Sequence, residues 1–326
     1  MTSLKKIAEQ EIKNVYDWLI SNKLTLNWEK TFFVIYRSKR KVIEDICELK
    51  INHNCIKRVN SITYLGMTID EHLKWDKHVM NICSKLTRNF HLFYNLRNLL
   101  PNHLKRQLYY SLVHSRIQYG IEVYGNCAKI MITRIQTMQN KLLKVLFKRP
   151  FRTPTIDLHN EYKLLKVEDI YRLNLMKFVF NSVRKQSISQ FHKYFKFQRT
   201  IHSHETRQQT LLYFERPRTA FGENSIKHTG ATIWNSLDPS LHKSKSINTF
   251  KKCLKNALLS KYLRWLYLLP SSFLKYSWVI STLYSEHNLD TFLERAGFQL
   301  KKRDLIYKHY LHSGITITCL LFLQPG

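Results

Sequence analysis

The chain has 326 residues, of which 44% are hydrophobic and 13% aromatic, and its 53 Lys and Arg against 23 Asp and Glu give a net charge of +30. This apolar content excludes a mainly disordered protein, and the length predicts about two domains. The charge indicates a polyanionic partner, either nucleic acid or an anionic membrane surface. A basic ribosomal-type protein fits the charge equally well, so the charge defines a class of partner and no mechanism.

The cysteines and the apolar tracts indicate where in the cell the protein is expected. The cysteines lie at Cys47, Cys55, Cys83, Cys127, Cys253 and Cys319. They include no Cys-x-x-Cys pair for a zinc ribbon, and we expect the thiols to be reduced and mostly buried. No secretory signal opens the sequence, and the most apolar tracts, 263–284 and 315–323, are interrupted or too short to cross a membrane. We therefore expect an intracellular protein, in the nucleus or the cytoplasm, that is not secreted and has no transmembrane segment.

The first part of the chain mixes one helix with short strands. Apolar side chains at near-helical spacing over residues 4–20 predict an amphipathic helix with Trp18 at its inner end. Phe32 to Tyr36 is typical of a buried strand. Alternation on both sides of Asn52-His53-Asn54 predicts two strands joined by a turn.

A further strand is predicted from Ile62 to Ile69. Gly66 interrupts its middle, which indicates either a β-bulge or the close approach of another backbone.

The rest of the pattern is helical. Three apolar stripes between Trp75 and Phe147 predict a small bundle of three helices, and Pro101 fits the opening of the second. Arg149 to Pro154 predicts a linker, followed by a second, mostly helical unit. The predicted fold is α+β and mostly α, divided into residues 1–74, 75–150, 155–260 and an unassigned tail, 261–326.

An ordered series of short matches resembles a known family. The series begins with Trp18-Leu19, Asn22-Lys23-Leu24, Asn27 and Lys30-Thr31, and continues with Tyr64-Leu65-Gly66 and Leu73-Lys74-Trp75. Tyr119-Gly120, Gln139-Asn140, Gly230, Trp234-Asn235 and Phe250-Lys251 extend it. Each match is weak alone, but their order resembles the segment after the catalytic strand in reverse transcriptases of LINE-type, jockey-like non-LTR retrotransposons.

The resemblance implies an incomplete reverse-transcriptase palm over 1–74, a helical thumb over 75–150 and a C-terminal helical unit. The family's Tyr/Phe-Ala-Asp-Asp turn lies upstream of the Trp18 segment, so we expect a C-terminal fragment that starts after this turn. The strands at 32–36 and 62–69 then cannot complete the parent sheet, which predicts a marginally stable N-terminal region.

Reverse transcription needs carboxylates that hold two metal ions. The acidic pairs Glu44-Asp45 and Glu168-Asp169 have no Tyr-x-Asp-Asp context, and we expect them on solvated faces or at helix starts; Asp70 is expected to end a strand. His202-Ser203-His204 has no third ligand nearby and is interpreted as a polar loop. We expect no catalytic residue, no metal site and no bound cofactor in this fragment; for the intact parent enzyme the resemblance implies Mg²⁺.

Three groups of residues are candidates for contact with nucleic acid. By resemblance, Lys30 lies near the incoming nucleotide, and Tyr64, Leu65 and Gly66 correspond to the primer grip. Each also has an alternative without contact to nucleic acid. Lys30 is then an ordinary surface lysine, Tyr64 and Leu65 belong to a buried strand, and Gly66 forms an ordinary β-bulge.

The third group is the charge of the bundle. Between Lys77 and Asn160 there are 14 Lys or Arg but only Glu122 and Asp157 as acids, whereas a solvated helix face usually mixes both signs. Such a bias favours salt-sensitive, sequence-independent phosphate contacts. The candidates are Lys77, Lys85, Arg88, Arg97, Lys105, Arg106, Arg116, Lys141, Lys144, Lys148 and Arg149. Tyr109, Tyr110, Tyr119 and Tyr124 lie among them and either stack on bases or, more simply, pack in the core.

The sequence thus predicts a fragment of an RNA-directed DNA polymerase that binds template–primer duplexes of RNA and DNA without catalysis. The alternative is a non-catalytic, basic nucleic-acid-binding or structural protein derived from the element. A membrane-surface protein would need an exposed apolar face, which the bundle stripes do not leave. The sequence does not define the oligomeric state.

Overall fold

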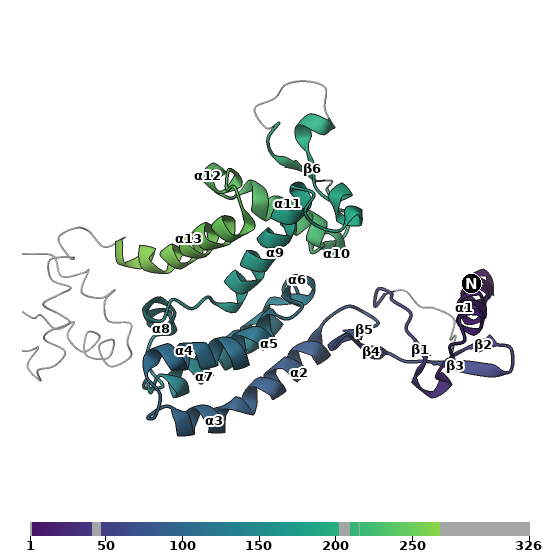
Figure 1. The fold of residues 1–326 in the computed structure, drawn as a ribbon, viewed down its shortest axis with the longest axis horizontal. Coiled ribbons are helices and arrows are strands. Elements are labelled where there is room, and N and C mark those ends of the chain that lie inside the picture. Colours follow the sequence, from purple (N-terminus) through teal and green to yellow (C-terminus); the bar gives the residue numbers. More distant parts are fainter. Residues whose placement is uncertain (1, 41–46, 202–208, 215, 268–326) are drawn as a thin grey trace, which may run out of the picture.

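The computed structural model describes residues 2–40, 47–201, 209–214 and 216–267. Over these residues the chain is mostly helical with small sheets, which agrees with the predicted α+β, mostly α class. Figure 1 shows helix α1 and strands β1 to β3 at one end of the molecule and the remaining helices gathered at the other.

The N-terminal part is a three-stranded sheet with one helix against it. Its elements are α1 (Thr2–Ser21), the 3₁₀ helix η1 (Trp28–Lys30), β1 (Phe32–Phe33), β2 (Glu48–Ile51) and β3 (Asn54–Arg58). Strand β3 is central, pairing antiparallel with β2 and parallel with β1. The predicted pair of strands around Asn52 is therefore confirmed, and Asn52 takes the left-handed conformation that the tight turn needs.

Two expectations for this region are wrong. The side chain of Trp18 is 60% exposed instead of lying at the inner end of its helix, because α1 turns Ile12, Tyr16 and Leu19 inward and Trp18 falls outside that stripe. The strand predicted over 32–36 has only two residues, because only Phe32 and Phe33 pair with β3, and the side chain of Phe32 is 42% exposed instead of buried.

The strand predicted from Ile62 to Ile69 is a hairpin instead. Strands β4 (Ser61–Tyr64) and β5 (Met67–Asp70) pair antiparallel around Leu65 and Gly66, whose φ angles are 47° and 77°. Two consecutive residues at positive φ match the right-handed twist of the flanking strands. Gly66 is therefore a turn residue and not a bulge.

The bundle has more helices than predicted, because the first and second apolar stripes are each divided between consecutive helices. Its elements are α2 (Asp76–Thr87), α3 (Asn89–Leu96), α4 (Asn102–Tyr109), the π-helical turn η2 (Tyr110–His114), α5 (Ser115–Gln118), α6 (Ile121–Tyr124) and α7 (Lys129–Leu146). Pro101 precedes α4, as expected.

The helices after residue 150 pack around α9, most of whose residues are buried. The elements are α8 (Thr155–Glu161), α9 (Val167–Val183), η3 (Ser189–Lys193), β6 (Lys196–Phe197), η4 (Gln198–Thr200), β7 (Leu212–Tyr213), α10 (Ala220–Glu223), α11 (Ile226–Asn235), α12 (Pro239–His242) and α13 (Ile247–Tyr267). One hydrophobic cluster runs from Trp75 to Leu258, and α9 packs against both α7 and α13 within it. The boundary at 149–154 stays a prediction.

The expectation that the cysteines are mostly buried is wrong for Cys47, Cys55 and Cys253, which are exposed. Cys83 and Cys127 are half-buried, and burial raises the pKa of the Cys127 thiol to about 11. Among the helices that the structure describes, none has the length and apolar character needed to cross a membrane.

Candidate nucleic-acid interface

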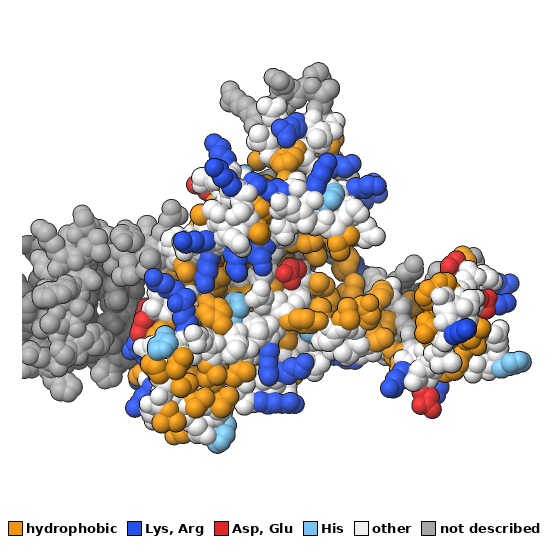
Figure 2. Space-filling view, in the orientation of Figure 1, with side chains coloured by type: hydrophobic (Ala, Val, Ile, Leu, Met, Phe, Trp, Pro, Cys, Tyr) orange, Lys and Arg blue, Asp and Glu red, His pale blue; other side chains and the backbone are white. Residues whose placement is uncertain are grey.

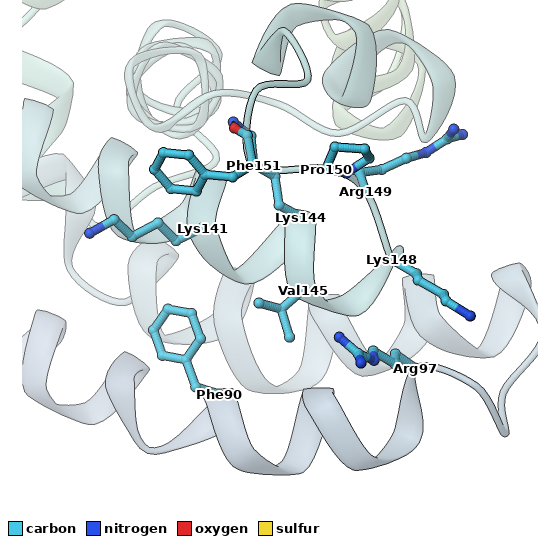
Figure 3. Close-up of a pocket in the computed structure, with 9 residues that line it drawn as sticks. All are labelled: Phe90, Arg97, Lys141, Lys144, Val145, Lys148, Arg149, Pro150 and Phe151. Atoms are coloured by element: carbon cyan, nitrogen blue, oxygen red, sulfur yellow. The ribbon is translucent and has the colours of Figure 1, made fainter.

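An open pocket of about 580 Å³ lies between α3, the C-terminal half of α7 and the segment that follows α7. We call it the basic pocket. Its lining contains five cations and four apolar residues: Arg97, Lys141, Lys144, Lys148, Arg149, Phe90, Val145, Pro150 and Phe151 (Figure 3). All five cations belong to the predicted set of phosphate-contacting residues, so the fold brings this part of the set together.

The spacing of two lysines explains why they share one side of α7. Lys141 and Lys144 lie three residues apart on one face of the helix, and Lys148 follows just after the helix ends at Leu146. The positive end groups also suit the C-terminus of α7, where the helix dipole is negative. Lys148 takes a φ of 53°, and this left-handed residue ends the helix and turns the chain towards Pro150.

Internal contacts hold three of the five cations in place. Lys144 donates to the backbone oxygen of Phe151, and Arg149 donates to Glu161 and to the hydroxyl of Tyr162. The guanidinium of Arg97 lies 3.8 Å from the centroid of the Tyr94 ring.

Lys141 and Lys148 are exposed, and Figure 3 shows both side chains extending away from α7. These two lysines are therefore the cations best placed to meet an external phosphate.

Two aromatic side chains face the same pocket. Phe90 on α3 is half-buried, whereas Phe151 is 77% exposed, and Figure 3 shows both rings on the side where Lys141 lies. Exposed aromatic rings beside cations are typical of surfaces that bind nucleic acid, because a base can stack while its phosphate is neutralised. Neither residue was predicted as a contact, because Phe90 belongs to an apolar stripe assigned to the bundle core and Phe151 lies in 149–154, which was interpreted only as a linker. The available signal was an aromatic residue between Arg149 and Arg152.

The other predicted phosphate contacts lie outside the pocket. Lys77 donates to Ser61 Oγ at 2.9 Å and Arg116 donates to the backbone oxygen of Lys85 at 2.6 Å, which fixes both cations against neighbouring elements. Lys105 is only 8% exposed, so little of its side chain is available to a phosphate. The remaining three members of the set are Lys85 on α2, Arg88, which joins α2 to α3, and Arg106 on α4.

The turn that resembles a primer grip is exposed and contacts Tyr119, which belongs to another of the matching segments. Tyr64 and Leu65 are 63% and 71% exposed, so the alternative of a buried strand does not apply. The hydroxyl of Tyr119 donates to the Leu65 oxygen at 2.5 Å, and the Tyr119 ring lies beside Gly66. Gly120, with φ of 66°, lets Met67 pack directly on its backbone.

Lys30 lies apart from these surfaces. It is an exposed residue at the end of η1, where the side chain of Asn27 accepts from the Lys30 backbone N–H at 3.1 Å. Figure 1 shows β1, the strand that follows it, at the opposite end of the molecule from α3 and α7.

The acidic candidates have structural contacts. Asp70 ends β5 and its carboxylate accepts from the backbone N–H groups of His72, Lys74 and Trp75. Glu168 and Asp169 lie in the first turn of α9, as expected, but Asp169 is buried, which raises its carboxyl pKa. The described residues contain no group of three His, Cys, Asp or Glu that could hold a metal ion. Glu44-Asp45 and His202-Ser203-His204 lie outside the described residues.

The four tyrosines of the bundle divide into two pairs. Tyr109 and Tyr124 are fully buried, which excludes stacking on a base. Tyr110 is half-buried and Tyr119 is 56% exposed.

This basic, mostly helical chain, with its pocket of cations and aromatic rings, is similar to RNA-directed DNA polymerases of mobile elements. The chain is 27% identical over 156 residues to the RNA-directed DNA polymerase from mobile element jockey of Drosophila melanogaster and 25% identical over 169 residues to that of Drosophila funebris. It is 26% identical over 156 residues to the probable RNA-directed DNA polymerase from transposon X-element of Drosophila melanogaster. The predicted resemblance to jockey-like polymerases is confirmed.

These matches cover about half of this chain, 47%, 51% and 47% respectively. They span only 17%, 18% and 17% of the relatives. No protein-family model matches the chain, and no solved structure matches it significantly.

Proposed function

We propose that the chain is a nucleic-acid-binding part of a retrotransposon RNA-directed DNA polymerase, which holds template–primer duplexes of RNA and DNA at the basic pocket without regard to sequence. The observation that carries the proposal is the convergence of five cations and two phenylalanines on one pocket. Relatives that are RNA-directed DNA polymerases support the choice of nucleic acid over a membrane surface.

Electrostatics supports a contact with the backbone rather than with base edges. Lys141 and Lys148 can each neutralise one phosphate and release its counterions, which makes binding steeply dependent on salt and independent of sequence. Lys144 and Arg149 are already committed to internal contacts and contribute mainly to the potential of the pocket.

The test is fluorescence anisotropy with RNA–DNA and DNA–DNA duplexes of two unrelated sequences, over a series of salt concentrations. Replacing Lys141 and Lys148 together with Gln should weaken binding to all four duplexes alike and reduce the slope of log K against log salt by about 2. The matched control is Lys193→Gln with Lys196→Gln, which removes two exposed lysines from η3 and β6. Equal slopes for the pocket variant and the wild type would contradict the proposal.

We further propose that the chain does not itself catalyse polymerisation and binds no metal cofactor. Its 326 residues contain no adjacent pair of aspartates of the kind that holds the two metal ions in this chemistry. Mg²⁺ belongs in this proposal to the intact polymerase. Primer extension on an RNA template with Mg²⁺ should give no product, and a genuine extension product would refute this part of the proposal.

The alternative function is a non-catalytic, basic nucleic-acid-binding or structural protein derived from the element. It is favoured by the position of the basic pocket, which belongs entirely to α3, α7 and the segment after α7. Under this alternative, a chain without residues 1–74 should keep the full duplex affinity. A polymerase part whose palm and grip contribute to template–primer binding should lose affinity on the same deletion.

A further inference from the structure

A second group of cations lies where α4, α9 and α13 approach the π-helical turn η2. We call it the α13 cation cluster and define it as Arg106, Lys177, Lys251 and Lys255. Figure 2 shows Lys and Arg side chains gathered beside α13 on the face in view. The members come from three helices that are far apart in sequence, so the tertiary fold assembles the cluster.

Tyr110 holds the centre of the cluster. The amino group of Lys255 donates to the Tyr110 hydroxyl at 3.1 Å and lies 5.4 Å from the centroid of its ring. The guanidinium of Arg106 lies 5.8 Å from the same centroid. Two cations thus share one ring, although each raises the free energy of the other by repulsion.

A neutral histidine completes the site. The ring of His114 lies 4.9 Å from that of Tyr110, and its Nδ1 is buried without a hydrogen-bond partner. Burial, together with the charges of Lys255 and Lys251, lowers the pKa of His114 to about 4.

Lys177 extends the positive surface onto α9. Its amino group donates to Asn174 Oδ1 at 3.3 Å, and burial and the charge of Lys251 lower its pKa. Glu122 is the acidic group that opposes this effect. The four cations of the cluster, with Glu122 opposing the charge at Lys177, leave a surplus of positive charge that an anion would offset.

The shape of the backbone contributes to the same site. The π-helical turn Tyr110–His114 interrupts an otherwise regular helix and presents Tyr110 and His114 side by side. Such turns are rare and occur frequently at functional sites, since they weaken the helix locally.

We propose that the α13 cation cluster binds a phosphate group, as a site separate from the basic pocket. Lys251 and Lys255 supply the principal charges, Lys177 and Arg106 flank them, and the Tyr110 hydroxyl positions Lys255. The phosphate comes either from a nucleic-acid strand or from free phosphate, and these two sources share the chemistry that the cluster recognises.

The first measurement is thermal unfolding in inorganic phosphate and in chloride at equal ionic strength. The wild type should gain several degrees in phosphate, because a ligand that binds only the folded state stabilises it. Lys255→Met should lose this gain while its apolar stem still covers the Tyr110 ring. The matched control Lys196→Met, an exposed lysine on β6, should keep it.

The second measurement identifies the source of the phosphate and uses anisotropy with a single strand and a duplex over a salt series. If the source is nucleic acid, Lys255→Met should reduce the salt slope by about 1 for at least one of the two probes. An unchanged slope together with loss of the phosphate-dependent gain would identify free phosphate as the ligand. If Lys255→Met fails to fold, Lys251→Gln replaces it, because Lys251 is exposed.

A wild type whose unfolding temperature is the same in phosphate and chloride, with an unchanged slope in the variant, would overturn the proposal. This outcome is independent of the basic pocket, which is tested with Lys141 and Lys148 on the same probes.

Discussion

Several residues that carry the family resemblance have local structural roles. Asn27 caps the short helix that contains Lys30, and this contact explains the spacing of the two residues. The side chain of Asn235 both donates to the oxygen and accepts from the N–H of Leu212, so it pairs one otherwise open strand position with α11. Trp234 and Phe250 pack around Phe180 in the core. These identities are therefore explained by packing and hydrogen bonding and need no catalytic role.

Gly120 is the residue at which a small change should have the clearest effect. It combines a φ of 66° with a neighbour so close that an added Cβ would lie 2.5 Å from Met67 Sδ. We expect Gly120→Ala to lower the free energy of unfolding by about 1–2 kcal/mol, measured by urea denaturation, because an alanine in the left-handed region is strained.

Two further variants separate the causes. Gly120→Asn should cost less than Gly120→Ala if the backbone conformation dominates, since Asn tolerates positive φ. If the contact with Met67 dominates, adding Met67→Ala to Gly120→Ala should recover part of the lost free energy of unfolding. An unchanged stability for Gly120→Ala would show that neither matters.

At the scale of elements, the joint between α7, α8 and α9 is a buried polar network. Gln139 is fully buried and donates to the Tyr109 hydroxyl at 2.6 Å and to the Leu165 oxygen at 2.9 Å. The backbone N–H of Val167 donates to Gln136 Oε1 at 2.8 Å, and His159 Nδ1 lies 2.9 Å from the Leu164 oxygen. A network that is satisfied in this way fixes the angle between the helices, because each group left unpaired would carry a desolvation cost.

The histidine of this joint predicts a loss of stability in mild acid. Burial lowers the pKa of His159 to about 4, below the unfolded value of about 6.5. The unfolded chain therefore takes up the proton first as the pH falls through 6.5, so the stability present above that pH declines down to about pH 4. The slope is about 1.4 kcal/mol per pH unit for one such histidine, and His114 adds a second contribution of the same sign.

Urea unfolding at pH 7.0 and at pH 5.5 measures this loss. We expect a lower midpoint at pH 5.5 and a smaller pH effect in His159→Gln, which cannot titrate. Equal midpoints at both pH values would contradict the assignment of neutral, buried histidines.

At the scale of the whole molecule, the helices on both sides of residue 150 depend on one another. The hydrophobic cluster from Trp75 to Leu258 includes side chains from α2, α7, α9 and α13, with α9 at its centre. The sheet of β1, β2 and β3 has only a small core of its own, in which Leu49, Ile51 and Ile56 are buried. A chain segment that buries so little apolar surface gains little stability on folding.

We therefore predict that residues 75–267 unfold in one cooperative transition and that residues 75–150 alone do not, because the latter expose the face that α9 covers. Residues 1–75 alone should show no sharp transition by circular dichroism. A cooperative transition for 75–150 in isolation would instead support an independent domain that ends at the Arg149–Pro154 linker.

The sequence by itself determined the class of the fold, the β2–β3 hairpin, the helix-opening role of Pro101 and the likeness to jockey-like polymerases, because periodicity, turn residues and ordered matches are local properties. It misplaced Trp18 and Gly66, since the inward face of a helix and the register of a hairpin depend on what packs against them. Composition indicated a polyanionic partner, but only the fold showed which of the basic residues lie together on one surface. The packing of α3 on α7 brought Arg97 and the lysines of α7 together in the basic pocket. The approach of α13 to the π-helical turn created the α13 cation cluster. Sequence spacing does not encode either site, because cations from distant helices meet only where the core brings those helices together.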